Sequence, residues 1–337
     1  MASIVRKHLP KKGDAVTTGQ LRHRAVGIGA VVLTGALALS ACGSSKSTAT
    51  TPAPGASSVG DIFSSIQVDP TLKAKLPSAL QTAGFIVASD ASYAPNEFFD
   101  TDNKTIIGMD VDLGKALSKK IGVPFTFQNA GFDSIIGGIN SGKYQLGMSS
   151  FTDSKVREQT VDFVTYFSAG VSVIVKAGNP QNLKPMDVSL CGKKIAVEKG
   201  TTELDELSPI VDAKKGLGDV TALCKTAGKP IAIAQPYPDE NGANLALSTG
   251  RADAIMADSP VAAYAIKQSN GQFATAGAAY GTAPYGIAVG KNLGGSKDAI
   301  LAALKGLIAD GSYQKVLQKW GVQDGAITSP VINGATS

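Results

Sequence analysis

The chain has 337 residues, 43% of them hydrophobic, which is enough for two lobes with a core in each. Its formal net charge of +5 arises in residues 1–41, where six basic residues face one acidic residue, so the other 26 basic and 26 acidic residues balance. This balance excludes a charge-driven nucleic-acid surface, and we expect no nucleic-acid partner.

Residues 1–41 have the pattern of a secretory signal peptide. A basic start is followed by an apolar run, AVGIGAVVLTGALAL, that is short for a membrane span and ends in small residues. An uncleaved signal anchor is the alternative interpretation. The end of the run, Leu39-Ser40-Ala41-Cys42, resembles the bacterial lipobox, in which Cys42 becomes the lipidated first residue of the mature protein.

The segment after Cys42 is rich in small and polar residues, GSSKSTATTPAPGASSVG, and cannot form a core. We assign residues 42–68 to the lipidated cysteine and a flexible tether, and expect folded structure from about Asp61. The folded part is then anchored outside the cytoplasmic membrane.

Strands alternate with helices in the first half of the folded part. Residues 108–122 predict a helix with acidic residues in its first turn and lysines in its last. The expected strands are FIVASD (85–90), PFTFQNA (124–130), YQLGMSS (144–150) and VSVIVKAG (171–178), with a further helix over DSIIGGINSG (133–142).

The same alternation restarts in the second half. A strand followed by a turn is expected over residues 193–202, and strands over 230–235, 252–258 and 285–290. Helices are expected over 241–250 and 260–269, and a helical hairpin or broken helix over 297–321. This order predicts an α/β fold with parallel-rich sheets covered on both faces. Because ligands of open α/β sheets bind beyond the carboxyl ends of the strands, we expect a cleft between two lobes.

The residues that remain after signal removal limit the possible chemistry. His8 and His23 both lie in the leader, so the mature chain has no histidine for a nucleophile system or a metal site. We therefore predict no catalytic residues, no metal and no cofactor, although a carboxylate-only enzyme stays open. Cys191 and Cys224 are the two remaining cysteines; outside the cell a disulfide is favoured, with two separate buried thiols as the alternative.

Polar groups at the strand ends are complementary to an α-amino acid. Ser149, Ser150 and Thr152 follow one strand, and Arg157 lies one turn beyond, where its guanidinium can grip a carboxylate with two parallel bonds. Gly200-Thr201-Thr202 opens a helix whose N–H groups attract an anion. Other strand ends offer Asp258 for an ammonium group and two rings for a side chain, Tyr93 and Phe132.

Each of these residues also has a purely structural interpretation. Arg157 can be a solvated helix residue, Thr202 with Asp205 a helix cap, and Asp258 an N-cap. Tyr93 and Phe132 can be ordinary core residues.

The ordered blocks resemble the amino-acid-binding (family 3) solute-binding proteins of ABC importers, from about residue 69 to the end. The blocks are SDASYAPNEFFD, GMDVDLGKAL, FDSIIGGINSGKYQLGMSSFTDSKVREQTVDFV, VEKGTT, SGRADAIMADSPVAAY and YGIAVGK. The resemblance implies a type II periplasmic-binding-protein fold with lobe one in residues 69–168 and 284–337 and lobe two in 169–283. It places the two crossings near Phe167–Gly170 and Gly281–Tyr285.

The resemblance also implies roles for individual residues. Arg157 would clamp the ligand carboxylate, helped by Ser150 and Thr202. Asp258, with Ser149 or Ser150 and Thr152, would take the α-ammonium. Asp90 would lie near the ligand side chain, between Tyr93 and Phe132.

Two departures affect the expected ligand. Asn96 stands where the family usually has an aromatic residue or Met, and Leu207–Pro230 aligns poorly. Asp90, with Glu97 nearby, favours a polar or cationic amino acid such as glutamine, arginine or lysine ahead of glutamate or aspartate.

The function implied is a lipid-anchored, monomeric receptor that delivers a free amino acid to the permease of an ABC importer. A dehydratase-like enzyme on the same fold and a sensory ligand-binding module are the alternatives.

Overall fold

The computed structural model describes residues 59–208 and 218–336. All described residues belong to one compact unit within Pro52–Ser337. The signal peptide predicted for residues 1–41 and the lipidated Cys42 therefore lie outside the described residues. Within the described part, no helix is both long and apolar enough to cross a membrane.

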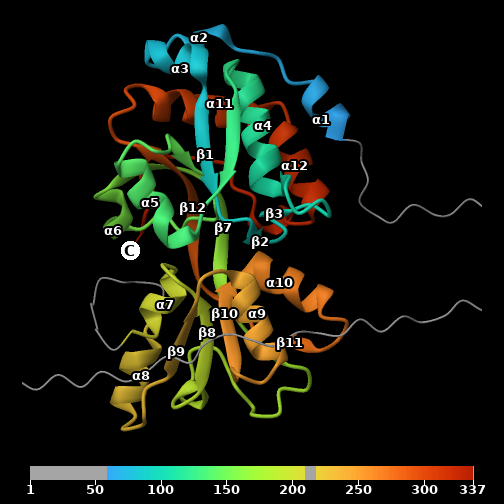
Figure 1. Cartoon of the computed structure of the whole chain (residues 1–337), viewed down its shortest axis with the longest axis vertical. Coiled ribbons are helices and arrows are strands. Elements are labelled where there is room, and N and C mark those ends of the chain that lie inside the picture. Colours follow the sequence, from blue (N-terminus) through green and yellow to red (C-terminus); the bar gives the residue numbers. More distant parts are fainter. Residues whose placement is uncertain (1–58, 209–217, 337) are drawn as a thin grey trace, which may run out of the picture. The chain divides into compact units, whose positions relative to one another are not determined.

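A nine-stranded sheet forms the framework (Figure 1). Its path runs in the order β5-β1-β6-β12-β7-β10-β8-β9, and β11 pairs with β7. The strand bounds along this path are β5 Phe125–Asn129, β1 Phe85–Ser89, β6 Leu146–Gly147, β12 Tyr280–Gly290, β7 Val161–Lys176, β10 Ala254–Asp258, β8 Lys194–Glu198, β9 Ile233–Tyr237 and β11 Phe273–Thr275. A small second sheet holds β2 Ser92–Tyr93, β3 Glu97–Phe99 and β4 Ile106–Ile107.

The sequence predicted two parallel-rich sheets, and the structure has two parallel groups at the two ends of one large sheet. β1 pairs in parallel with β5 and β6, and β8 pairs in parallel with β9 and β10. The long antiparallel pair β7 and β12 joins the groups, and both predicted crossings lie within these strands. The strand predicted from Val171 starts earlier, because β7 begins at Val161 and is buried along nearly its whole length.

Helices cover both faces of the sheet. Their bounds are α1 Val59–Ser64, α2 Pro70–Lys73, α3 Ser78–Ala83, α4 Met109–Ile121, α5 Phe132–Asn140, α6 Lys155–Glu158, α7 Thr202–Glu206, α8 Val220–Thr226, α9 Glu240–Ser248, α10 Ser259–Gln268, α11 Ser296–Ala309 and α12 Ser312–Trp320, with 3-10 turns η1 Val188–Leu190 and η2 Gln323–Gly325. The helix predicted over residues 108–122 is α4, which ends at Gly122 in the left-handed conformation that glycine adopts easily.

The tether was predicted to extend too far. Ile62 and Ile66 are buried and belong to the largest hydrophobic cluster, and α1 begins at Val59. The apolar residues in this short segment are sufficient to attach it to the fold, although its composition looks like a linker. This finding agrees with folded structure from about Asp61 rather than from residue 69.

The buried residues fall into two groups, which define two lobes. Two clusters draw on residues 62–169 and 285–322, and we call this part lobe one. Two other clusters draw on residues 171–280, and we call this part lobe two. In Figure 1, α4, α11 and α12 pack on the β1 end of the sheet, and α7 to α10 pack around β8 and β10.

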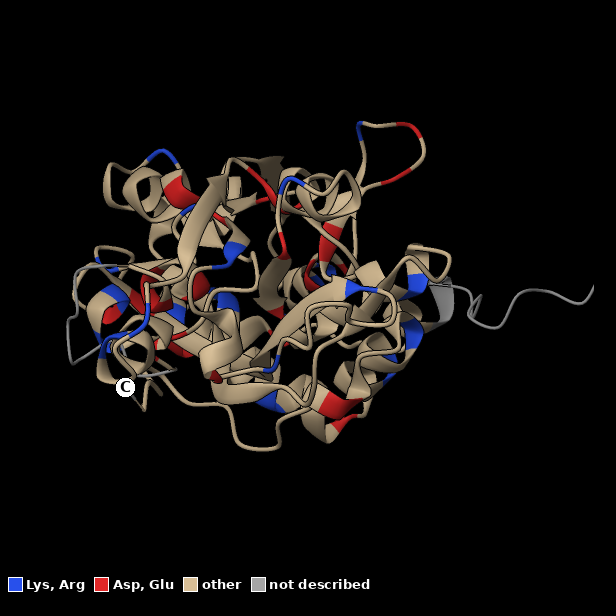
Figure 2. Ribbon diagram, turned by 90° about the horizontal axis from the view of Figure 1, so that it is seen from below, with Lys and Arg blue, Asp and Glu red and all other residues tan. Residues whose placement is uncertain are grey.

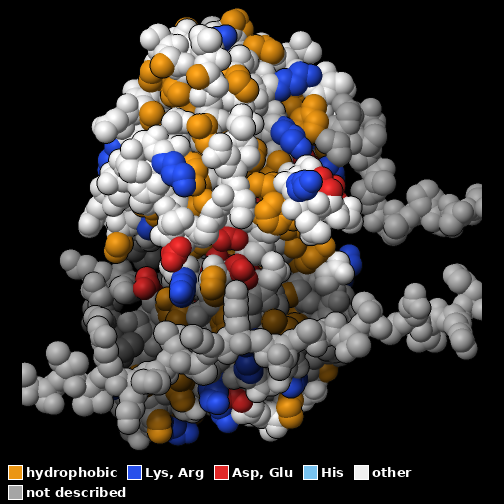
Figure 3. Space-filling view, in the orientation of Figure 1, with side chains coloured by type: hydrophobic (Ala, Val, Ile, Leu, Met, Phe, Trp, Pro, Cys, Tyr) orange, Lys and Arg blue, Asp and Glu red, His pale blue; other side chains and the backbone are white. Residues whose placement is uncertain are grey.

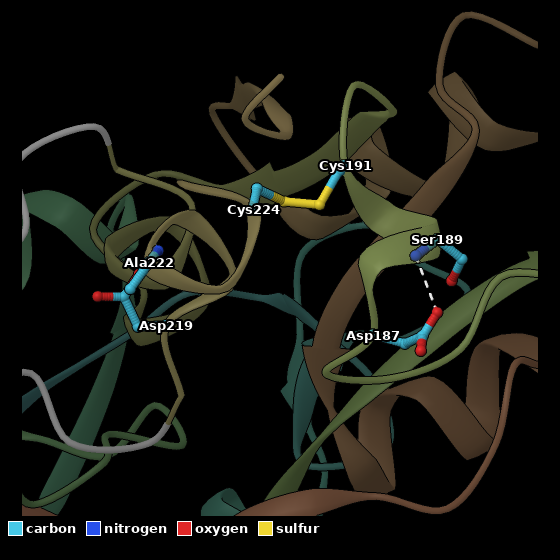
Figure 4. Close-up of a disulfide and its surroundings, with 6 residues drawn as sticks. All are labelled: Asp187, Ser189, Cys191, Asp219, Ala222 and Cys224. Atoms are coloured by element: carbon cyan, nitrogen blue, oxygen red, sulfur yellow. Dashed lines mark hydrogen bonds between the residues drawn. A yellow bond between two sulfur atoms is a disulfide. The ribbon is translucent and has the colours of Figure 1, made fainter. Parts of the chain in front are cut away.

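The predicted disulfide is confirmed. Cys191 follows η1, Cys224 lies in α8, and their sulfur atoms are 1.99 Å apart (Figure 4). The bridge attaches α8 to the segment that follows η1 in lobe two. Asp219 caps α8 by accepting a hydrogen bond from the Ala222 N–H at 2.6 Å.

Candidate functional site

The turn after β6 is held by side chains from several parts of lobe one. The Asp90 N–H donates to Ser149 Oγ at 2.8 Å, and Asn96 Nδ2 donates to Ser150 Oγ at 2.9 Å. Ser149 Oγ and Ser150 Oγ donate in turn to the two carboxylate oxygens of Glu97, at 3.2 and 3.3 Å. Both hydroxyls are therefore at the predicted strand end, and both are engaged within lobe one.

Glu97 lies elsewhere than expected. It is completely buried behind the two serines, next to Asp110, instead of at the side-chain end of a ligand pocket. Tyr166 donates its hydroxyl to Asp110 at 2.7 Å, and Asp110 accepts the Ser150 N–H at 3.2 Å. Burial and the neighbouring Asp110 raise the pKa of Glu97, and burial raises the pKa of Asp110 to about 6.

Arg157 projects from α6 toward lobe two. Its Nη1 donates to the Thr152 carbonyl oxygen at 2.8 Å, and its Nη2 donates to the Gly200 carbonyl oxygen at 2.9 Å. The guanidinium carbon lies 5.5 Å from the ring centroids of both Phe132 and Phe151. Because a guanidinium has five N–H donors, three stay free for a carboxylate after these two bonds. This geometry argues against a solvated helix residue.

The start of α7 faces Arg157. The N-cap is Thr201, whose Oγ1 accepts the Leu204 N–H at 3.3 Å, so the alternative cap formed by Thr202 with Asp205 is wrong. Thr202 instead donates its hydroxyl to Glu203 Oε2 at 3.2 Å. The first turn of α7 thus presents backbone N–H groups beside a buried carboxyl group.

Asp258 and Glu203 form a first pair of carboxyl groups. Asp258 ends β10 at the N-cap position of α10, but its side chain makes no capping hydrogen bond, so capping does not explain it. Burial and the neighbouring Glu203 raise the pKa of Asp258, while the Arg157 charge lowers it. Burial also raises the pKa of Glu203, whose Oε1 has no hydrogen-bond partner among the described residues.

A second group of carboxyl groups, which sequence reasoning missed in part, consists of Asp90, Glu198 and Glu240. Asp90 Oδ2 accepts the Phe132 N–H at 2.9 Å. Glu198 is 1% exposed, and neither of its carboxylate oxygens has a partner among the described residues. Burial, with Asp90 and Glu240 nearby, raises the pKa of Glu198 to about 11. Glu198 is the last residue of β8, and this position at a strand end was the available signal.

Glu240 enters the same group from α9. It is 1% exposed, its Oε2 has no partner among the described residues, and burial with the nearby Glu203 charge raises its pKa. Its backbone N–H donates to Ser92 Oγ of lobe one at 3.2 Å. Its sequence position at a helix start gave no indication that it would be buried against the other lobe.

The rings lie beside these carboxyl groups. Tyr93 and Phe132 are nearly parallel, with planes 11° apart and centroids 6.2 Å apart, and Phe132 also stacks on Phe151 at 4.4 Å. Both predicted ring residues are almost completely buried.

The site as a whole is acidic. Five carboxyl groups are buried here, Asp90, Glu198, Glu203, Glu240 and Asp258, and two of them, Glu203 and Asp258, interact with the charge of Arg157. In Figure 3, Asp and Glu side chains gather on one face, below the level of α5 and α6 and above the start of α7. Figure 2 shows acidic residues near the centre of the view from below. Among the described residues, no group of three or more Asp, Glu, Cys or His has the arrangement of a metal site.

The chain belongs to the bacterial extracellular solute-binding proteins, family 3, and residues 85–323 match the sequence model of this family. This assignment confirms the predicted family and the type II periplasmic-binding-protein fold. The mature protein of this family acts outside the cytoplasm, in agreement with the expected address.

Individual relatives are similar over most of the chain. The arginine-binding protein ArgT of Corynebacterium glutamicum is 33% identical over 267 residues, covering 78% of this chain and 83% of that protein. The solved structure of an ancestral arginine-binding protein bound to arginine has a TM-score of 0.62 and 32% identity, covering 71% of this chain and 97% of that one. An ancestral amino acid-binding protein described as a precursor of cyclohexadienyl dehydratase has a TM-score of 0.58 and 30% identity, with coverages of 71% and 95%.

Proposed function

We propose that this protein captures a cationic α-amino acid in the cleft between its lobes and delivers it to the permease of an ABC importer. The observation that carries the proposal is the charge inventory of the site, in which one guanidinium faces two groups of buried carboxyl groups. A cationic amino acid brings one carboxylate and two positive groups, so its charges match this inventory. An acidic amino acid brings two carboxylates and leaves most of the acidic groups without a partner.

The main-chain end of the ligand is assigned to Arg157 and the first acidic pair. The free N–H donors of Arg157 take the carboxylate, with Ser150, Thr201 and Thr202 beside it. Asp258 and Glu203 take the α-ammonium, with Ser149, Ser150 and Thr152 nearby. Burial raises the pKa values of the two acids even though the Arg157 charge lowers them, which supports a second cation beside the pair.

The side-chain end is assigned to Asp90, Glu198 and Glu240. The two unpartnered oxygens of Glu198 can accept two parallel N–H bonds, as a guanidinium offers. The nearly parallel rings of Tyr93 and Phe132 provide flat faces for a cationic group. The names of the arginine-binding relatives support arginine as the first ligand to test.

The capture step is proposed to be closure of two lobes, residues 69–168 with 284–337 and residues 169–283, about the crossings in β7 and β12. Direct bonds between the lobes, such as Arg157 to Gly200, support a closed state that a ligand contacting both lobes would favour. The protein acts as a monomer anchored through a lipid on Cys42. Mass spectrometry of the membrane fraction tests the anchor, and an unmodified Cys42 there contradicts it.

The two histidines lie in residues 1–41, so the mature chain has none for an acid–base pair, which argues against the dehydratase-like alternative. The similarity to binding proteins supports the transport function. A thermal-shift screen of the purified mature protein against the common amino acids tests the proposal. A ligand at 100 times its Kd adds about 2.7 kcal/mol to the unfolding free energy, which is easily visible. We expect the largest shift with L-arginine or L-lysine; stabilisation by L-glutamate or L-aspartate alone would contradict the proposal.

A further inference from the structure

Residues Val331–Ala335, here called the C-terminal strap, lie beyond the region that matches the family and run along β7. The Thr165 N–H donates to the Val331 carbonyl oxygen at 2.9 Å, and the Asn333 N–H donates to the Phe163 carbonyl oxygen at 3.0 Å. The Phe163 N–H returns a bond to Asn333 Oδ1 at 2.8 Å. These bonds attach the strap to the segment of β7 around Phe163 and Thr165, which also pairs with β12.

The strap then passes to the turn that carries Arg157. The Gly334 N–H donates to Asp153 Oδ2 at 2.7 Å, and the Ala335 N–H donates to Glu158 Oε1 at 3.2 Å. Figure 1 shows the C-terminal end of the chain beside α6. Asp153 is 2% exposed, so its bond to the strap is shielded from water. The two accepting residues lie on either side of Arg157 in the sequence.

The turn that carries Arg157 is short, so contacts from outside it contribute to its shape. α6 is four residues long, and an isolated helix of that length is unstable in water. Its N-cap bond, from the Arg157 N–H to Ser154 Oγ, is long at 3.4 Å. On its inner side, the Asp153 N–H donates to the Pro284 carbonyl oxygen at 2.8 Å. The strap supplies the support on the other side.

We propose that the C-terminal strap is a positioning element of the ligand site, which holds Asp153 and Glu158 and so fixes the direction in which Arg157 enters the cleft. The proposal rests on the proposed function in one respect, namely that Arg157 binds the ligand carboxylate. If the strap only covered the edge of β7, its removal would lower the stability of lobe one as a whole. The turn that carries Arg157 would then be affected no more than other parts of the lobe.

Two matched pairs of variants isolate the strap bonds. Asp153→Ala removes the acceptor for the Gly334 N–H, whereas Asp153→Asn keeps an oxygen in its place. Glu158→Ala removes the acceptor for the Ala335 N–H together with the Glu158–Lys155 ion pair of 3.0 Å. Lys155→Ala removes the same ion pair and leaves the strap bond. A chain shortened after Pro330 removes the whole strap.

Hydrogen exchange in the ligand-free protein is the first test. The Glu158 and Thr160 N–H groups bond within the turn, to Ser154 and Arg157 at 2.9 Å each. We expect these two amides to exchange at least tenfold faster in the Asp153→Ala/Glu158→Ala double variant and in the shortened chain. Amides of α4 serve as the reference for general weakening. Unchanged exchange at the turn, or equal acceleration in α4, overturns the proposal.

Calorimetry with L-arginine as the probe is the second test. The Asp153→Ala/Glu158→Ala double variant should bind L-arginine about tenfold more weakly, and the Asp153→Asn/Lys155→Ala control should bind normally. In an Arg157→Ala background the same double variant should cause no further loss. A loss of equal size in that background overturns the positioning role. If the wild-type protein binds no amino acid, the proposed function fails, while the exchange test still decides whether the strap holds the turn.

Discussion

Arg157 of lobe one donates a hydrogen bond from Nη2 to the Gly200 carbonyl oxygen of lobe two, 2.9 Å away. The residue assigned to the ligand carboxylate is therefore also a direct link between the lobes. On the neighbouring side of the site, the Glu240 N–H of lobe two donates to Ser92 Oγ of lobe one at 3.2 Å. In the proposed function, ligand binding and lobe closure thus share the same residues, which is why a bound ligand should stabilise the closed state.

Replacing Arg157 by Ala should weaken L-arginine binding by about 2–5 kcal/mol, because the ligand carboxylate would be buried without its partner. Arg157→Lys should also bind poorly, since an ammonium cannot form the two parallel bonds. Arg251→Ala is the control, since Arg251 is exposed on lobe two and its side chain donates to Thr249 Oγ1 at 3.2 Å. Near-normal calorimetric affinity in both Arg157 variants would show that this residue does not clamp the ligand.

Glu198→Gln and Glu240→Gln should each reduce L-arginine affinity by about 1.5–3 kcal/mol, the range for hydrogen bonds to charged groups. The same changes should leave the affinity for L-citrulline, which has a neutral side chain of similar size, nearly constant. Glu206→Gln is the matched control, a buried carboxyl group that accepts the Tyr280 hydroxyl at 2.6 Å. Equal losses for both ligands would place Glu198 and Glu240 outside the side-chain subsite.

L-arginine binding should weaken as the pH falls from 8 to 5. Burial raises the pKa values of Glu198, Asp258 and Glu240, that of Glu198 to about 11, and so favours their protonated forms, whereas a cationic ligand favours the ionised forms. Calorimetry in buffers of different ionisation enthalpy should therefore detect proton release on binding. Proton uptake, or tighter binding at pH 5 than at pH 8, would contradict the assignment of these carboxyl groups to the ligand cations.

The ligand-free protein should become less stable as the pH rises from about 4 to 8. The pKa values of Asp110, Asp153 and Glu206 are raised by burial to about 6, 7 and 8, so the folded state binds more protons than the unfolded state across this range. The stability they contribute is present below the unfolded pKa near 4 and is lost as pH passes the folded values. Urea unfolding at pH 5 and pH 8 measures this, and greater stability at pH 8 would contradict it.

Removing the disulfide with Cys191→Ser and Cys224→Ser should lower the unfolding free energy of lobe two by roughly 3–4 kcal/mol, from the entropy of closing a loop with a sequence separation of 33. Thiol labelling of the unreduced, unfolded wild-type protein should find no free cysteine among the two. Two labelled cysteines would refute the bridge in the secreted protein.

Local sequence patterns were sufficient for the repeated strands and helices and for the residues at the ends of β1, β6 and β10. Asp90 and Asp258 could be found because each follows an apolar strand, and strand ends meet at one edge of a parallel sheet. The start of β7 was missed because a strand buried on both faces has no alternation of polar and apolar residues to mark its limits.

Glu198 and Glu240 could not be recognised from the sequence as a pair. They are 42 residues apart in the sequence. Glu198 lies near Asp90 and the Glu240 N–H bonds to Ser92, both of lobe one, and no local pattern encodes these contacts. Glu97 was placed near the pocket because it is close to Asp90 in the sequence. In the structure its side chain instead accepts hydrogen bonds from Ser149 and Ser150 within lobe one.

The central claim is that the site holds one carboxylate and two cations. Calorimetric titration of the purified mature protein with L-arginine, L-citrulline and L-glutamate tests it most directly, because the three ligands differ chiefly in the charge of the side chain. The charge inventory predicts tight binding of L-arginine, at least 100-fold weaker binding of L-citrulline, and no measurable binding of L-glutamate, since losing a desolvated charge pair costs about 2–5 kcal/mol. Equal affinity for L-arginine and L-citrulline, or preferential binding of L-glutamate, would contradict it.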